Sequence, residues 1–395
     1  MPTGFKELNP GKKILLGPGP SNVHPRVLQA MATPLISHLN PDFLKIMDQV
    51  QEMLRALFQT SNKVTLPITG TGSAGMEACL CNMIEPDDKV LICVNGFFGQ
   101  RMCDMVERMG GVLKSIEVNW GEVFHPQQVE KAVKEFHPQI VGIVHAETST
   151  GVLQPLKEMS EIVHEAGAIL IVDTVTSLGG CPVEVDEWQL NVTYSGTQKC
   201  IGCPPGLAPL SFNEAAMNKL SNRKKKGQSF YFDVALITRY WDSERVFHHT
   251  APISMIYALH EALRRVHEEG LENRFRRHKA NHEALVAGIE AMGIKMFVPK
   301  ENRLWTLNAV TIPEGIDDKK IRGKLLTDYN IEIGGGFGPL AGKIWRVGLM
   351  GESSNRANVL MFLSALEDTL SGEGVKIDRG AAVATAQAAY NRGGD

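Results

Sequence analysis

The sequence predicts an α/β protein, with a three-layer αβα large domain followed by a smaller α+β C-terminal domain. Between residues 63 and 174, apolar runs of strand length alternate with amphipathic runs of helix length. This alternation is typical of parallel β-α units, which form a sheet with helices on both faces. The chain has 395 residues, of which 43% are hydrophobic and 22% charged, so it can form one large core and a second, smaller one.

The first element that the sequence predicts clearly is a helix over NPDFLKIMDQVQEMLRALFQT. Asn40 is a suitable N-cap, and Pro41 stands at the first helical position, where proline is favoured. Apolar side chains then recur at helical spacing and fall on one face, namely Phe43, Ile46, Met47, Val50, Leu54 and Leu57. We expect this face to pack on the core.

Five strand-like runs follow in order: KVTLPIT, KVLICVNG, VLKSIEV, QIVGIVHA and AILIVDT. The helix-like runs between them are AGMEACLCNMIE, QRMCDMVERMG, HPQQVEKAVKEF and LKEMSEIVHEAG. A shorter polar-apolar alternation, QLNVTY, indicates one more strand. Open α/β sheets bind ligands at the carboxyl ends of their strands, so the residues that follow these runs are the candidates for a site.

The second half of the chain begins with a long helical stretch, from ISMIYALHEALRRVHEEG to RFRRHKANHEALVAGIEAMG. Shorter strand-like and helix-like runs follow, among them LNAVTIP, DDKKIRGKLLTDY, KIWRVGLMG and NVLMFLSALEDTL. We therefore expect an N-terminal arm over 1–20, the large domain over 21–270 and the small domain over 271–372. The tail, 373–395, has little to bury and is expected to be mobile.

The charge of the chain argues against nucleic acid and membrane surfaces as partners. The formal net charge is -3 and the pI is about 6.5, without the basic excess that a phosphate backbone attracts. No apolar run approaches the roughly 20 residues of a membrane helix, and the first 13 residues lack the apolar core of a secretory signal. A cytoplasmic protein that binds small molecules is the expectation.

The cysteines and histidines do not indicate a metal site. Most of the seven cysteines lie in apolar segments, where they read as small core side chains. Cys200 and Cys203 form a CxxC pair, but no second pair completes a tetrahedral site. His278 and His282 stand one helical turn apart without a third ligand, and we expect both to be exposed.

The glycine-rich turn GTGSAG, residues 70–75, has two functional interpretations. It fits the GxGxxG pattern of dinucleotide-binding proteins, but the next strand ends in Asn95 and Gly96 instead of the acidic residue that would hold a ribose. A helix N-terminus here can also hold a single phosphate, with Thr71 and Ser73 as further donors. A tight turn that needs glycine only for its backbone angles is the structural alternative.

Three further features point to the same edge of the sheet. Asp173 ends a very apolar strand, and Lys199 follows the next strand-like run. Phe97 and Phe98 follow another strand and offer a flat apolar surface. Pyridoxal 5′-phosphate needs this combination, because its aldehyde bonds to a lysine and its ring nitrogen stays protonated beside a carboxylate. Burial at the edge would lower the pKa of the lysine and leave part of it neutral.

Eight segments together carry a family resemblance: GPGPSN, TGTGSAGMEA, NGFFGQR, HAETSTGVLQPL, LIVDTVTSLGG, YSGTQK, FHHTAP and KIWRVGLMG. By their order and context, over about residues 14–370, the chain resembles the class V aminotransferases of the alanine–glyoxylate (serine–pyruvate) type. The resemblance implies the fold type I of PLP-dependent transferases and a homodimer with its sites at the subunit boundary.

The resemblance also implies roles for single residues. Lys199 matches the Schiff-base lysine and Asp173 the partner of the ring nitrogen. Val175 and Phe98 match the residues on the two ring faces, the latter often a tryptophan in relatives. Arg346 matches the arginine that holds the α-carboxylate of the substrate. Thr148 is similar to a residue near the phenolic oxygen, and the expected phosphate or turn contacts are Thr71, Gly72, Ser73 and Gln198.

Two positions concern the partner subunit. Thr250 resembles a residue that reaches the phosphate in the other subunit's site. Relatives commonly have a tyrosine where this chain has Phe247, so the hydroxyl contact expected there is missing.

The implied activity is transfer of an amino group from alanine or serine to glyoxylate or pyruvate by a ping-pong mechanism. The alternatives on the same scaffold are (S)-ureidoglycine–glyoxylate transamination and a cysteine desulfurase. A PLP-binding protein without turnover and a dinucleotide-binding domain are alternatives of another class.

Overall fold

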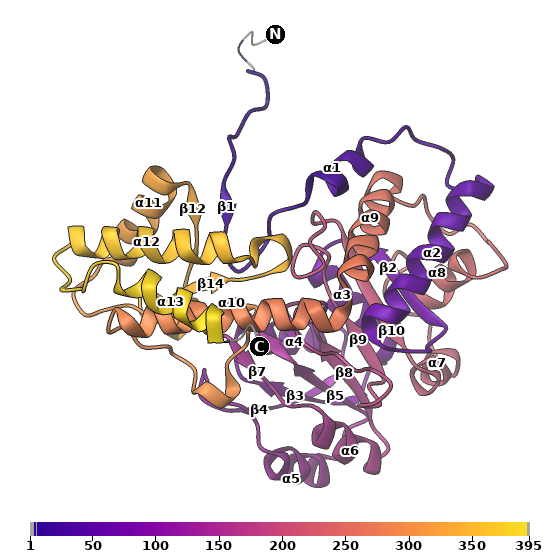
Figure 1. Ribbon diagram of the computed structural model, residues 1–395. Coiled ribbons are helices and arrows are strands. Elements are labelled where there is room, and N and C mark those ends of the chain that lie inside the picture. Colours follow the sequence, from indigo (N-terminus) through magenta and orange to yellow (C-terminus); the bar gives the residue numbers. More distant parts are fainter. Residues whose placement is uncertain (1–3, 5, 393–395) are drawn as a thin grey trace.

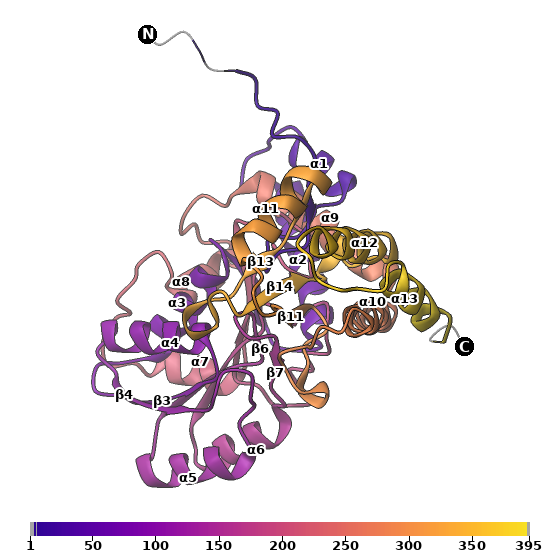
Figure 2. The ribbon, with the colours of Figure 1, turned by 90° about the vertical axis from the view of Figure 1, so that its left-hand side faces the viewer.

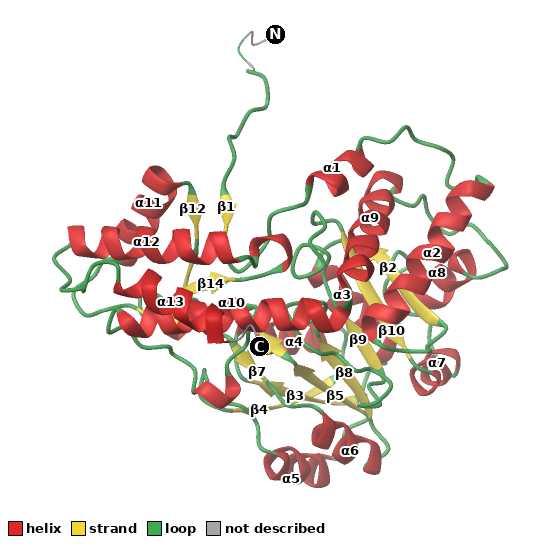
Figure 3. Cartoon of the chain, in the orientation of Figure 1, coloured by secondary structure: helices red, strands yellow, loops and turns green. Residues whose placement is uncertain are grey.

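A seven-stranded sheet forms the centre of the large domain, and the computed structural model describes residue 4 and residues 6–392 of the chain. The order of the strands is β2-β10-β9-β8-β5-β3-β4. Their bounds are Val64–Thr69 (β2), Lys89–Val94 (β3), Val112–Glu117 (β4), Ile140–Val144 (β5), Ile169–Asp173 (β8), Val192–Tyr194 (β9) and Leu207–Phe212 (β10). Helices lie on both sides of the sheet (Figure 3). The predicted three-layer α/β fold is confirmed.

Strand β10 departs from the expected parallel arrangement. It pairs antiparallel with both β2 and β9, whereas β3/β4, β3/β5, β5/β8 and β8/β9 are parallel pairs. Residues 195–206, between β9 and β10, contain no helix, and without a helical crossover the chain returns antiparallel. Because β10 is antiparallel to both neighbours, β2 runs in the same direction as β9. The carboxyl ends of all the strands except β10 therefore lie at one edge.

The helices of the large domain form groups on the sheet. Helix α3 contacts α4 and α7, whereas α5 contacts α6, and α2 packs against β2 and α9. Figures 1 and 2 show α5 and α6 together, apart from α3 and α4. The bounds are Pro25–Met31 (α1), Pro41–Phe58 (α2), Gly72–Met83 (α3), Phe97–Arg108 (α4), Pro126–Phe136 (α5), Lys157–Glu165 (α6), Glu214–Ser221 (α7), Val234–Trp241 (α8) and Ile253–Glu269 (α9).

Helix α2 confirms the helix predicted over residues 40–60. The side chain of Asn40 accepts a hydrogen bond from the Asp42 amide, and Pro41 occupies the first turn. Of the apolar residues on the predicted face, all are buried except Ile46, which is half-buried against the core.

The small domain has a three-stranded sheet, β11-β14-β13, and a two-stranded pair, β1 with β12. The strands are Ile14–Leu15 (β1), Leu307–Thr311 (β11), Ile331–Glu332 (β12), Gly334–Gly335 (β13) and Ile344–Gly348 (β14). The helices are Leu271–Ala291 (α10), Asp318–Tyr329 (α11), Arg356–Gly372 (α12) and Ala381–Arg392 (α13). Short elements complete the chain: β6 (Ala146–Glu147), β7 (Val152–Leu153), η1 (Lys300–Asn302), η2 (Gly338–Leu340) and η3 (Gly351–Ser353).

Two separate hydrophobic clusters support a domain division near residue 270, which remains our interpretation. The cluster of the large domain includes α9 side chains up to Val266. The cluster of the small domain takes Leu16 from the N-terminal arm and then begins with Ala284 of α10. The arm therefore packs with the small domain, and β1 pairs in parallel with β12.

The expected mobile tail is wrong over residues 381–392, where the chain forms helix α13. This helix lies along α10 in Figures 1 and 2, and its Ala382 and Ala386 are fully buried. The Tyr390 hydroxyl donates to Asn281 Oδ1 at 2.6 Å. Alanine side chains let the two helices approach closely, so a segment of small residues can pack against α10. Residues 393–395 lie outside the described part of the chain.

The expected exposure of His278 and His282 is also wrong, since both are buried on α10. His278 donates from Nδ1 to the Arg274 carbonyl at 2.8 Å and accepts at Nε2 from the Gly351 amide at 3.1 Å. His282 Nδ1 lies 2.6 Å from Asn308 Oδ1. Burial lowers the pKa of both, so they are neutral side chains that join α10 to its neighbours.

Among the helices that the structure describes, none is long and apolar enough to span a bilayer.

Candidate active site

A cavity of about 190 Å³ lies at the carboxyl edge of the central sheet. Every cofactor-binding residue predicted from the sequence lines it, with the exception of Thr250. The lining residues are Thr71, Gly72, Ser73, Met76, Phe98, Arg101, Val144, Ala146, Thr148, Asp173, Val175, Gln198 and Lys199. Segments more than 100 residues apart in sequence thus meet at one place because five strands end there.

Asp173, the last residue of β8, lines this cavity and is buried. Its Oδ1 accepts from the Val175 amide and its Oδ2 from the Tyr194 hydroxyl, each at 2.8 Å. Burial raises the pKa of Asp173 to about 6, and the two hydrogen bonds oppose that rise. Tyr194 was not identified from the sequence. The feature that would have revealed it is the register of β8 with β9, in which Tyr194 is the partner of Asp173.

Lys199 lies just beyond β9 and is buried. Its Nζ donates to the Pro18 carbonyl, and burial lowers its pKa to about 8. A Cβ at Gly19, where φ is +104°, would come within 2.7 Å of Lys199 Cδ. The GPGPSN motif of the arm therefore covers the lysine, and glycine is required at that point of closest approach. Ser21 fixes the lysine backbone by donating from Oγ to the Lys199 carbonyl at 2.9 Å.

The glycine-rich turn between β2 and α3 presents backbone donors to the cavity. Thr71 is the N-cap of α3 but makes no side-chain capping bond. Within the described part of the chain, the Gly72 and Ser73 amides have no acceptor. Gly70 has φ of +132°, and a Cβ at Gly72 would lie 2.9 Å from Val175 Cγ2. The glycines thus serve both the backbone angles and close packing, and the helix N-terminus suits an anion.

Gln198 adds a polar group with no hydrogen-bond partner in the described structure. Its Oε1 is buried, and the side chain lines the cavity next to Lys199. Buried amide groups nearly always have a partner, so this one fits contact with a bound ligand.

Phe98 and Glu147 are linked at the start of α4. The Phe98 amide donates to Glu147 Oε2 at 3.1 Å, and Ser149 Oγ donates to Oε1 at 2.6 Å. Glu147 is fully buried, which raises its pKa to about 7. Phe98 meets Phe97 edge-on, with ring centroids 5.7 Å apart. Glu147 was not identified from the sequence, because its partners become neighbours only in the folded chain.

Arg346 lies on β14 of the small domain and approaches the cavity through Thr148. It is buried, donates from Nε to the Gly335 carbonyl at 2.7 Å and from Nη1 to the Thr148 carbonyl at 3.3 Å, and stacks 4.0 Å from the Phe337 ring centroid. Burial lowers its pKa to about 10. Among the described residues it has no carboxylate partner, so its charge is available to an incoming carboxylate.

Thr250 and Phe247 lie between α8 and α9, are exposed, and do not line the cavity of their own chain. The role of Thr250 in a partner's site stays a prediction.

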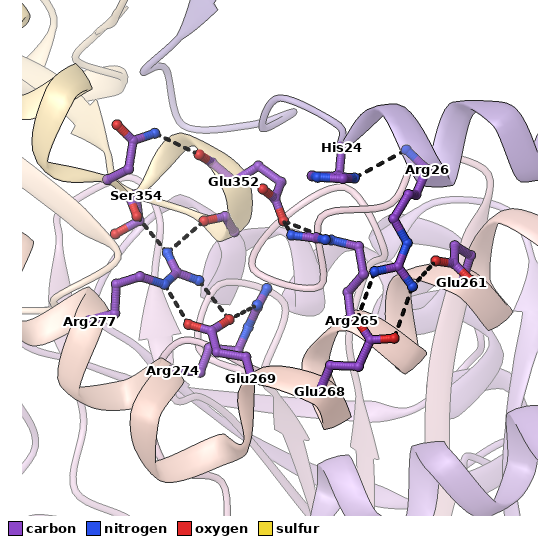
Figure 4. Close-up of polar contacts among 12 residues, drawn as sticks. His24, Arg26, Glu261, Arg265, Glu268, Glu269, Arg274, Arg277, Glu352 and Ser354 are labelled. Atoms are coloured by element: carbon purple, nitrogen blue, oxygen red, sulfur yellow. Dashed lines mark hydrogen bonds and ion pairs between the residues drawn. The ribbon is translucent and has the colours of Figure 1, made fainter.

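An ionic cluster of Arg274, Glu269 and Arg277 lies at the junction of α9 and α10 (Figure 4). Arg274 is only 2% exposed and donates to the carbonyls of Gly179, at 2.9 Å, and Cys200. Its charge is balanced by Glu269, at 2.6 Å, which also pairs with Arg277. Arg277 in turn donates to the Gly351 carbonyl at 3.0 Å. The cluster therefore connects the start of α10 with both the lysine loop and η3.

The thiols do not form a reactive pair in the structure. All seven cysteines are free, and Cys200 and Cys203 are buried. Burial raises the pKa of Cys200 to about 11, so its thiolate is scarce at neutral pH. In the part of the chain that is described, no three His, Cys, Asp or Glu side chains gather as a metal site would need.

Comparisons with known proteins agree with this geometry. The family model described as "Aminotransferase class-V" matches residues 14–357. A ureidoglycine–glyoxylate aminotransferase from Bacillus subtilis is 43% identical, with a TM-score of 0.96 over 98% of this chain and 100% of that one. An alanine–glyoxylate aminotransferase from Nostoc sp. is 48% identical, with a TM-score of 0.92 over 93% and 98%. A Drosophila melanogaster alanine–glyoxylate aminotransferase is 40% identical over 93% of this chain and 95% of its own. The chain therefore belongs to the class V aminotransferases.

Proposed function

We propose that the protein transfers an amino group from a small amino acid, alanine or serine, to glyoxylate or pyruvate, with pyridoxal 5′-phosphate as cofactor. The observation that carries this proposal is the pairing of Lys199 and Asp173 in one cavity. The amides of Gly72 and Ser73, which have no acceptor in the described part of the chain, lie at the same cavity. Arg346 on β14 reaches the carbonyl of the cavity residue Thr148 and has no carboxylate partner among the described residues.

The residues fit the cofactor by their chemistry. Asp173 would hold the ring nitrogen, since a carboxylate with two donors of its own is fixed in place. The Gly72 and Ser73 amides would donate to the phosphate, and the side-chain NH2 of Gln198 would be a further donor. Phe98 would lie against the ring. When bound, pyridoxal phosphate supplies an electron sink for the bonds at the substrate's α-carbon.

Lys199 would transfer the proton of the substrate's α-carbon. Its pKa of about 8 leaves part of the amine neutral near neutral pH, so Nζ can bond to an aldehyde carbon or accept a proton. The same amine can return that proton, which suits a reaction run forward with one amino acid and backward with a second keto acid. Ping-pong kinetics are expected.

Arg346 would orient the substrate through two parallel hydrogen bonds to its α-carboxylate. Among the described residues, the only arginine that lines the cavity is Arg101, and it already bonds to Ser73. Small monocarboxylic amino acids are therefore the proposed donors.

We also propose that the active form is a homodimer in which Thr250 of each chain reaches the other chain's site. In support, Thr250 and the neighbouring apolar Phe247 are exposed, and Phe247 is 52% accessible in the single chain. We place the protein in the cytoplasm, where its free thiols would stay reduced.

The decisive experiment is a panel of amino donors against glyoxylate, pyruvate and 2-oxoglutarate, followed by the loss of cofactor absorbance and by keto-acid release. K199A should abolish turnover yet still bind cofactor noncovalently, whereas K45A, at an exposed lysine, should behave as wild type. Near-normal turnover by K199A would refute the proposal. Sulfide release from cysteine would instead indicate a desulfurase.

The second candidate donor is (S)-ureidoglycine, with glyoxylate as acceptor. It is favoured by the similarity to the Bacillus subtilis ureidoglycine–glyoxylate transaminase, which is 42% identical over 99% of both chains. Including (S)-ureidoglycine in the donor panel decides between the two candidate functions. With glyoxylate as the acceptor in both reactions, the donor with the higher kcat/KM identifies the function.

A further inference from the structure

Arg101 is a cavity residue with no role assigned by the sequence pattern. It lies on α4, in the first turn after Phe97 and Phe98, and lines the same cavity as Lys199. Within the described residues no carboxylate pairs with it, in contrast to Arg108 on the same helix, which pairs with Asp104 at 2.9 Å. Among the described residues its guanidinium is therefore a positive charge at the cavity that forms no ion pair.

Its position is fixed by two aromatic rings instead of an ion pair. The guanidinium carbon lies 5.2 Å from the Phe97 ring centroid and 4.9 Å from that of Phe98. Residues three and four positions apart on a helix share a face, which explains why Arg101 meets both rings. Cation–π contacts of this kind orient a guanidinium without neutralising it.

Among the described residues, Arg101 makes one hydrogen bond to a side chain, and this bond determines where the hydroxyl proton of Ser73 can point. Nη1 lies 2.7 Å from Ser73 Oγ. Arginine has only donors, so the serine oxygen must be the acceptor in this bond. The hydroxyl proton of Ser73 is then free to point away from Arg101, and both residues line the cavity.

We infer that Arg101 is a positioning residue for anion binding at the glycine-rich turn: by donating to Ser73 Oγ, it directs the Ser73 hydroxyl proton toward the phosphate of the cofactor. The hydroxyl then joins the free amides of Gly72 and Ser73 at the N-terminus of α3. The charge of Arg101, which forms no ion pair among the described residues, adds an attraction for the same anion. This inference rests on the proposed cofactor and concerns only its phosphate.

The test compares binding of pyridoxal 5′-phosphate with binding of pyridoxal, which lacks the phosphate. Full-length protein freed of cofactor is titrated with each compound, and the dissociation constant is read from the visible absorbance. R101M should weaken binding of the phosphorylated compound by about tenfold or more, the effect of losing a hydrogen bond to a charged group. Pyridoxal should bind R101M within about twofold of wild type, and R101K, which keeps a charged donor, should recover part of the loss.

The double variant shows whether the effect passes through the serine. If Arg101 acts by orienting Ser73, R101M should weaken phosphate-dependent binding much less in an S73A background than in wild type. R108Q, on the same helix, is the matched control and should leave both dissociation constants unchanged.

Three results would overturn the inference: equal weakening of both compounds in R101M, an unchanged dissociation constant for the phosphorylated compound, or full additivity with S73A. A wild-type protein that binds neither compound would refute the proposed function as well. Circular dichroism of each variant separates misfolding from lost binding.

Discussion

Burial of Lys199 should make the cofactor-free protein less stable at neutral pH than a variant without the amine. The pKa falls from 10.5 to about 8 because of desolvation. Each pKa unit corresponds to about 1.4 kcal/mol, so the cost of protonating the folded state is about 3 kcal/mol. K199M keeps a chain of similar length and removes the charge. It should therefore be more stable than wild type at pH 7.

The pH dependence has a definite sign. Below pH 8 the amine is protonated in both states, and the folded protein bears the full cost. Between pH 8 and 10.5 only the unfolded chain holds the proton, so wild-type stability rises with pH. The advantage of K199M should thus shrink by about 3 kcal/mol across this window.

Urea denaturation of both cofactor-free proteins, followed by tryptophan fluorescence from pH 7 to 11, measures this difference. K45M, at an exposed lysine, serves as control and should differ from wild type by the same amount at every pH. A constant difference between K199M and wild type over the whole range would refute the reasoning.

Three substitutions test other parts of the site. G19A should lower cofactor retention, measured by absorbance after dialysis, because the added Cβ would overlap Lys199. The control G323A, in an open position on α11, should retain the cofactor as wild type does. R274M should destabilise the protein by about 3 kcal/mol or more, since the buried carbonyls of Gly179 and Cys200 lose the donor from Arg274 and Glu269 keeps only Arg277 as a partner. The exposed R276M is its control in thermal denaturation. R346K should raise KM for alanine by about tenfold or more with a smaller change in kcat, because lysine cannot make two parallel hydrogen bonds to a carboxylate. The control R379K, at the surface, should leave both constants unchanged.

The parallel strands could be predicted because each is a short apolar run bounded by turn residues and joined to the next by a helix. Strand β10 carries the same kind of apolar run, LAPLSF, but its direction depends on the connection from β9, which local composition does not encode. The exposure predicted for His278 and His282 rested on their polarity. Both are buried because the carbonyl of Arg274, the amide of Gly351 and the side chain of Asn308 satisfy them.

The candidate site was predictable where a residue follows a strand, as Asp173 and Lys199 do. Residues whose role depends on tertiary neighbours were harder to identify from the sequence. Tyr194 becomes visible only once β8 and β9 are placed in register, and Glu147 only once its loop meets the start of α4. Arg101 could have been found by its helical spacing from Phe97 and Phe98, had these rings been placed at the start of a helix.

Four ionisable side chains at the site share one cause for their altered pKa values. Burial raises the pKa of Asp173 to about 6 and of Glu147 to about 7, and it lowers the pKa of Lys199 to about 8 and of Arg346 to about 10. In each case the charged form is disfavoured by the loss of water. A ligand that brings a cation to Asp173 and a carboxylate to Arg346 offsets the burial penalties of these two side chains. Binding should therefore stabilise the protein most strongly between about pH 6 and 10, where both partners are charged.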